Sequence, residues 1–125
     1  VLEHIRDEPE ALREGRSVLD AAAVQRELAQ HGVRLSEQIG AISYVRICPF
    51  EGRQVPHLVV QTPTGPVTVM LLLDEHASGS IVIDKGAFSG RIVPAGNGSI
   101  AIVGIGHPVD AAEQSRIVAA VAWEA

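Results

Sequence analysis

The chain has 125 residues, of which 46% are apolar and 20% are charged, and its formal net charge is −5. This length and apolar share predict one packed soluble domain and exclude a disordered chain. Ten basic residues against fifteen acidic ones leave no surplus of positive charge, so nucleic acid and anionic membrane surfaces are excluded as expected partners.

Residues 1–39 form an acidic zone with the pattern of helices. Glu8-Pro9 is expected to end or kink a first short helix, because proline disfavours helical backbone before it. Ser17 with Asp20 is a capping-box pattern that opens a second helix, and Gly32 is its expected end. The apolar stripe of this second helix comprises Ala21, Val24 and Leu28. The sequence therefore predicts two N-terminal helices.

Residues 41–105 change to β-branched runs separated by glycine and proline, a pattern typical of strands. The turn Gly96-Asn97-Gly98 between two such runs is a strong hairpin signal. Short separators join antiparallel neighbours, because a parallel return needs a dozen or more residues. The expected strands are Ala41–Cys48, Val55–Thr62, Val67–Leu73, Ser80–Asp84, Ala87–Pro94 and Ser99–Ile105.

The tail, Pro108 to Glu124, has the pattern of a third helix. Proline suits the first turn of a helix, and Asp110 lies where the helix dipole favours an acid. The expected fold class is α+β, with an antiparallel sheet of about five to six strands and with two N-terminal helices and one C-terminal helix packed on it. Residues 1–125 then form one domain that is helical over 1–39, a sheet over 41–105 and a helix over 108–124.

No sequence pattern indicates an enzyme. The chain has no Gly-x-Ser-x-Gly, no phosphate-loop signature, no His-Glu-x-x-His and no Cys-x-x-Cys. The acidic pairs Glu8 with Glu10 and Asp74 with Glu75 lie in polar stretches, which we interpret as solvated surface. The turn Gly104–Pro108 lacks the third glycine of a dinucleotide site and is interpreted as a strand-to-helix turn. We expect no catalytic residue.

The single cysteine, Cys48, is a candidate site residue together with His57. A hairpin that pairs Val45 with Val60 sets Cys48 opposite His57, within reach of a shared metal. Cysteine and histidine are the usual zinc and copper ligands, and His4 is the best remote third ligand. Three alternatives stay open: buried packing, which is favoured and needs no cofactor, ligation of a transition metal or haem, and a reactive thiol. The remaining histidines are interpreted as surface residues: His31, His76 and His107.

The chain resembles an uncharacterised bacterial domain family. The residues that carry the resemblance are His4, Glu8-Pro9, Cys48-Pro49, Gly52, His57-Leu58-Val59-Val60 and Gly65-Pro66-Val67-Thr68-Val69. Members of that family are single-span inner-membrane proteins with a short cytoplasmic front half like an anti-sigma factor. The resemblance implies that this chain is the soluble region after the span, a periplasmic domain anchored through a segment outside this sequence.

The expected function is therefore that of a non-enzymatic sensor or interaction domain of a membrane-anchored regulator. The opening at Val1 in the register of a helix agrees with a domain excised from a longer protein. This function predicts a protein partner, or self-association, through an apolar patch or an exposed strand edge. The alternatives are a metal- or haem-binding module and a thiol redox protein, and the alternative location is the cytoplasm.

Overall fold

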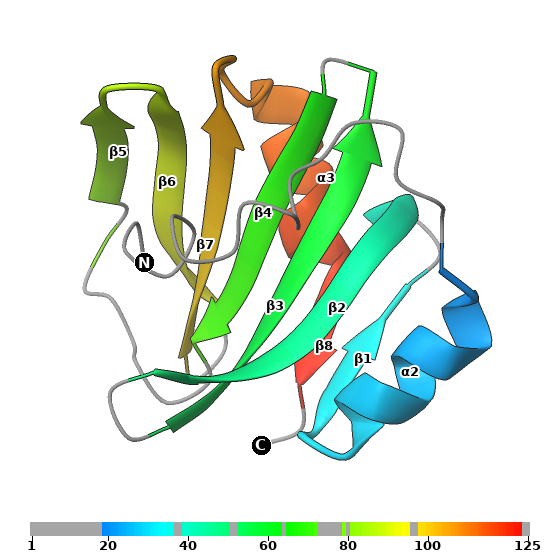
Figure 1. Ribbon diagram of the computed structural model, residues 1–125. Coiled ribbons are helices and arrows are strands. Elements are labelled where there is room, and N and C mark those ends of the chain that lie inside the picture. Colours follow the sequence, from blue (N-terminus) through cyan, green and yellow to red (C-terminus); the bar gives the residue numbers. More distant parts are fainter. Residues whose placement is uncertain are drawn as a thin grey trace.

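The computed structural model describes residues 19–36, 39–50, 53–63, 65–72, 79, 81–95 and 98–123 (Figure 1). Within these ranges the chain forms eight strands, in two antiparallel sheets, and two short helices. The expected α+β class with three helices is therefore wrong, since the described part of the chain is mostly antiparallel β structure. The first expected helix, ending near Glu8-Pro9, lies outside the described residues.

The larger sheet has six strands in the order β2-β3-β4-β7-β6-β5, and every neighbouring pair is antiparallel. The β2–β3, β3–β4, β5–β6 and β6–β7 pairs follow one another along the chain, as the short separators predict. Only the β4–β7 pair joins strands that are not consecutive, which places β5 at one edge of the sheet. The bounds are β2 Ala41–Phe50, β3 Arg53–Thr62, β4 Gly65–Leu72, β5 Ile81–Lys85, β6 Phe88–Ala95 and β7 Gly98–Ile105.

These six strands lie where the sequence predicts them, with ends that differ by up to two residues. Differences of two residues occur at the start of β4 and at the β2–β3 turn, where Pro49 and Phe50 were expected to lie outside the strand. Both belong to β2, and Phe50 pairs with Arg53, so only residues 51 and 52 separate the paired positions. β2 is an edge strand among the described strands, so no further strand pairs with its outer side. A proline near its end lacks a backbone N–H but breaks no hydrogen bond to such a strand.

The first helix described, α2, spans Ala21–Ala29. Asp20 is its N-cap and its side chain makes no capping hydrogen bond, so the expected capping box with Asp20 inside the helix is wrong. Ser17 lies outside the described residues. The turn after the helix ends at Gly32, which has a φ of 73° that glycine adopts without strain. The chain then enters a strand within the zone that was expected to be wholly helical.

The C-terminal helix is shorter than expected. Helix α3 spans Ala111–Ala120, and the Asp110 side chain caps it by accepting a hydrogen bond from the Ala112 N–H at 2.7 Å. The chain leaves the helix at Val121 to form β8, Val121–Trp123, which pairs with β1, Val33–Leu35. The predicted continuation to Glu124 is therefore wrong, because pairing with a strand far away in the sequence overrides the helical spacing.

The main core lies between one face of the six-stranded sheet and the elements that cover it. Figure 1 shows α3 against this face, and α2 packs beside β1. Ile117 of α3 and Leu28 of α2 are both completely buried in this core. The sheet contributes alternate residues of its central strands: Leu58, Val60, Val67, Val69, Leu71, Ile100 and Ile102.

The opposite face of the sheet is also apolar and buried along its central strands. Met70 and Ala101 are Cα partners, and with Val55 and Leu72 they form a second cluster. Three buried polar side chains lie among these alternate positions, His57 on β3, Thr68 on β4 and Ser99 on β7. Strands with two buried faces agree with the nearly continuous apolar runs in the sequence.

Candidate functional site

The register of the β2–β3 hairpin does not bring Cys48 opposite His57. The Cα partner of His57 is Arg46, and the Cα partner of Cys48 is Val55. Val45 pairs with Leu58 rather than with Val60, a shift of two residues from the predicted register. A two-residue shift keeps every side chain on its face, so the predicted alternation is correct although the predicted pairing is wrong.

His57 lies inside the protein, with no solvent-exposed surface. Its ring meets the ring of Tyr44 edge to face, with the ring centroids 5.4 Å apart and the ring planes at 66°. Met70 of β4 is its Cα partner on the other side. This environment is typical of a histidine that packs in a core, which is the interpretation the sequence favoured.

The other expected metal ligand, His4, lies outside the described residues. Over the described ranges, no group of three or more histidine, cysteine or acidic side chains is arranged to hold a metal ion. The acidic residues Glu8, Glu10, Asp74 and Glu75 also fall outside the described part of the chain. A metal or haem site on Cys48, His57 and His4 thus stays a prediction.

The turn between β7 and α3 holds a histidine with a structural role. His107 Nε2 lies 3.1 Å from the carbonyl oxygen of Pro66, and Nδ1 lies 3.1 Å from that of Pro108. The ring packs against Gly65, where a Cβ atom would come within 2.9 Å of Nε2. His107 therefore joins the start of β4 to the turn, and the expected interpretation as a simple surface residue misses this contact.

The outer edge of β5 is the first candidate interaction surface. Ile81 is 52% exposed and Val82 is 65% exposed, the two largest exposures of a large apolar side chain among the described residues. Successive residues of a strand point to opposite faces, so the two side chains expose apolar surface on both sides of this edge. Among the described strands, β5 has a neighbour on one side only, β6.

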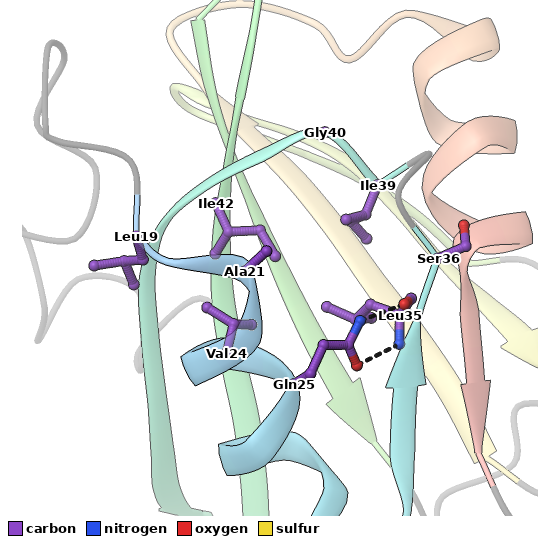
Figure 2. Close-up of a pocket in the computed structure, with 9 residues that line it drawn as sticks. All are labelled: Leu19, Ala21, Val24, Gln25, Leu35, Ser36, Ile39, Gly40 and Ile42. Atoms are coloured by element: carbon purple, nitrogen blue, oxygen red, sulfur yellow. Dashed lines mark hydrogen bonds between the residues drawn. The ribbon is translucent and has the colours of Figure 1, made fainter.

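A pocket beside α2, the α2 pocket, is the second candidate site (Figure 2). Its volume is about 320 Å³. Figure 2 shows Val24, Leu35, Ile39 and Ile42 pointing toward one another around this space. The described residues that line it come from the start of α2, the end of β1, the segment after it and the start of β2: Leu19, Ala21, Val24, Gln25, Leu35, Ser36, Ile39, Gly40 and Ile42.

Gln25 closes one wall of the α2 pocket. Its Nε2 donates to the carbonyl oxygen of Leu35, and its Oε1 accepts from the Leu35 N–H at 3.2 Å. Sequence reasoning missed this residue, because a glutamine on a helix has no pattern that distinguishes a structural amide from a solvated one. The exposed Ile81-Val82 pair could have been found from the sequence, because two β-branched apolar residues lie in a strand shorter than its neighbour β6.

Comparison with known proteins places the chain in a family. No helix of the described part of the chain is long and apolar enough to cross a membrane. A search of curated proteins and a search of solved structures found no match to the chain. One family model, described as "Protein of unknown function (DUF3379)", matches residues 1–116. The chain therefore belongs to this family of proteins of unknown function.

Proposed function

We propose that this domain acts without catalysis, by pairing with a second copy of itself through the edge of β5. The observation that carries the proposal is the exposure of Ile81 and Val82 on an open edge strand. Monomeric proteins rarely leave an apolar edge uncovered, because its unpaired backbone groups are a template for another strand. An edge of this kind supports an interaction domain.

The backbone of β5 is suited to receive a strand. Its ladder with β6 runs from Ile81 to Lys85 without a register shift, so no bulge twists the edge away. Its charged residues, Asp84 and Lys85, lie at its end and leave Ile81–Ile83 apolar. Charges and bulges are the usual protection of an edge against association, and the first three residues of β5 have neither.

The opposite edge of the sheet, β2, is less open than β5. Its pairing with β3 shifts between Ile42 and Tyr44, as a bulge does. The carbonyl oxygen of Ile42 accepts a hydrogen bond from the Leu19 N–H at 2.8 Å, so part of this edge is already occupied. Within the described ranges, β5 is therefore the more open edge.

A second copy of the chain fits β5 because the strand is complementary to itself. In an antiparallel pair centred on Val82, this residue faces Val82 of the second copy, and Ile81 faces Ile83 of the second copy. Because the pair is two-fold symmetric, the Ile81–Ile83 contact occurs twice, once from each copy. Side chains on one face of the sheet meet side chains on the same face of the second copy. The result is one continuous sheet with an apolar centre.

Such a pair is weak, because a strand of five residues buries much less surface than a stable interface of about 1,600 Å². We expect a dissociation constant between about 10 μM and 1 mM, in the range of transient interfaces. The net charge of −5 on each copy opposes association, and salt screens this repulsion. Dimerisation should therefore strengthen between low and moderate salt.

Analytical ultracentrifugation at protein concentrations from micromolar to millimolar tests this function. We expect the parent to form a dimer and Val82→Lys to weaken it at least tenfold, because a lysine at the seam must lose its hydration. Ala22→Lys is the matched control, since it adds the same charge at an exposed position on α2. A parent that stays monomeric throughout, or a lysine variant that associates as the parent does, would overturn self-pairing; β5 would then be free for a strand of a different protein.

The cellular setting is a second part of the proposal, and the resemblance described above supports it. A sensor or interaction domain of a membrane-anchored, anti-sigma-like regulator would lie in the periplasm. Alkaline phosphatase fused to the C-terminus of the complete gene product tests this location, because the enzyme folds only where its disulfides form. Phosphatase activity in whole cells agrees with the periplasm, and an inactive fusion that is produced at full length assigns the cytoplasm.

A further inference from the structure

We infer that the α2 pocket binds a small uncharged aliphatic molecule, with an unbranched chain of about ten carbons as its best ligand. This inference does not rest on the β5 edge. The pocket volume of about 320 Å³ is far larger than the gaps that close packing leaves in a protein interior. It also falls within the size range of small-molecule sites, which begins at about 300 Å³.

The walls of the pocket select for apolar chemistry. Val24, Leu35, Ile39 and Ile42 are all buried and present only hydrocarbon to the space. Among the described residues that line it, none has an ionisable side chain. A ligand with a charged group inside this space would leave that charge without a partner, which is costly in an apolar environment.

Two polar residues of the described lining, Gln25 and Ser36, have hydrogen-bond partners within the protein. Both amide atoms of Gln25 are hydrogen-bonded to the backbone of Leu35, which holds this side chain against β1. The Ser36 N–H donates to the carbonyl oxygen of Ala120 at 2.8 Å, and the residue has a further partner. A buried water needs two to four polar partners, so this lining suits hydrocarbon better than ordered water.

The size of the ligand follows from the volume. An apolar cavity of about 150 Å³ holds a benzene molecule, and the α2 pocket has about twice that space. At about 30 Å³ for each group of the size of a water molecule, the space accommodates roughly ten methylene-sized groups. An unbranched alkyl chain of about ten carbons has this size.

The position of the pocket links a ligand to the rest of the fold. Val24 and Gln25 belong to α2, Leu35 to β1 and Ile42 to β2, so an occupant contacts three elements at once. β1 in turn pairs with β8, which follows α3 directly. Binding would therefore hold α2 against both sheets, and the domain would be more stable with the ligand than without it.

Fluorescence titration with 1-naphthylamine, a small uncharged aromatic dye whose size matches the pocket volume, tests the inference. We expect saturable binding of one dye per chain and displacement by 1-decanol. In a series of linear alcohols, affinity should rise about fourfold for each added methylene and stop rising near ten carbons, where the chain fills the pocket. Affinity that keeps rising beyond this length, or dye binding that does not saturate, would contradict a pocket of defined size.

Ala21→Trp supplies the structural control, because Ala21 lines the pocket at the exposed start of α2 and a large ring there occupies the space. We expect the dye affinity to fall at least tenfold, and Ala21→Leu to give a smaller loss. Ala22→Trp places the same ring at the next exposed residue, outside the lining, and should bind as the parent does. Equal binding by Ala21→Trp and the parent, with both folded by circular dichroism, would overturn the inference.

Discussion

The side chain of Gln25 stands in for a third strand beside Leu35. Leu35 lies in β1, which within the described part of the chain has a strand partner on one side only, β8. Its N–H and carbonyl groups both bind the Gln25 amide, which donates and accepts as a peptide group of a neighbouring strand would. One side chain thereby fixes α2 to β1 and satisfies two backbone groups that would otherwise depend on solvent.

Gln25→Ala is expected to lower the free energy of unfolding by about 1–2 kcal/mol, because it removes two hydrogen bonds of ordinary strength. Urea denaturation measures the change. Gln30→Ala is the matched control: Gln30 is exposed at the end of α2, and only its backbone caps the helix. Equal losses in the two variants would show that the amide contact with Leu35 adds nothing to stability.

Asp110 and Asp20 offer a second matched comparison, since each is the N-cap of a helix and only Asp110 uses its side chain. Asp110→Ala should cost about 1 kcal/mol, the typical loss of a capping hydrogen bond. Asp110→Asn keeps an acceptor oxygen and should recover most of this loss. Thermal unfolding of the three variants tests the assignment, which fails if Asp20→Ala costs as much as Asp110→Ala.

Local signals in the sequence were sufficient to place the strands of the six-stranded sheet. Each strand has a β-branched run bounded by glycine or proline, and this pattern depends on nearby residues alone. The end of α3 was not predictable in the same way. Val118 and Ala122 continue the helical spacing, and β8 forms because Val121–Trp123 finds a partner in β1, at the other end of the chain.

Whether Cys48 lies opposite His57 depends on the register of the hairpin, which the alternation of apolar residues does not determine. Pairing Val45 with Leu58 or with Val60 buries the same side chains, so both registers satisfy the apolar pattern. The observed register follows from the short β2–β3 turn between Phe50 and Arg53, and it moves Cys48 away from the position opposite His57. The α2 pocket was not predictable either, because a space between packed elements leaves no pattern in the residues around it.

His57 is expected to contribute to stability through packing. His57→Ala should lower the free energy of unfolding by about 2–4 kcal/mol, because it leaves a cavity beside Tyr44 in a fully buried place. The metal alternative predicts a different result in the same experiment. If His57 ligates a metal, the unfolding midpoint of the parent should be higher in Zn²⁺ than in EDTA. The midpoint of His57→Ala should then be the same in both.

At Gly90 the backbone of β7 lies where a side chain on β6 would begin. A Cβ atom at this position would come within 1.9 Å of the carbonyl oxygen of Ile102 and 2.8 Å of the Val103 Cα, and both are backbone atoms. Neither can move without separating the two strands, so even a methyl group has no room. Gly90→Ala should therefore lower the free energy of unfolding by about 2–4 kcal/mol, at the upper end of the cost of overpacking.

Gly79→Ala is the control for this prediction, because a Cβ atom there meets nothing within 4 Å and the backbone has no unusual φ. Its unfolding free energy should stay within about 0.5 kcal/mol of the parent. Chemical denaturation of both variants gives the comparison. Since β6 is the described strand that joins β5 to the rest of the sheet, separation of β6 from β7 by Gly90→Ala should also weaken self-association through β5. A Gly90→Ala protein as stable as the Gly79→Ala protein would show that the two strands lie further apart than the structure places them.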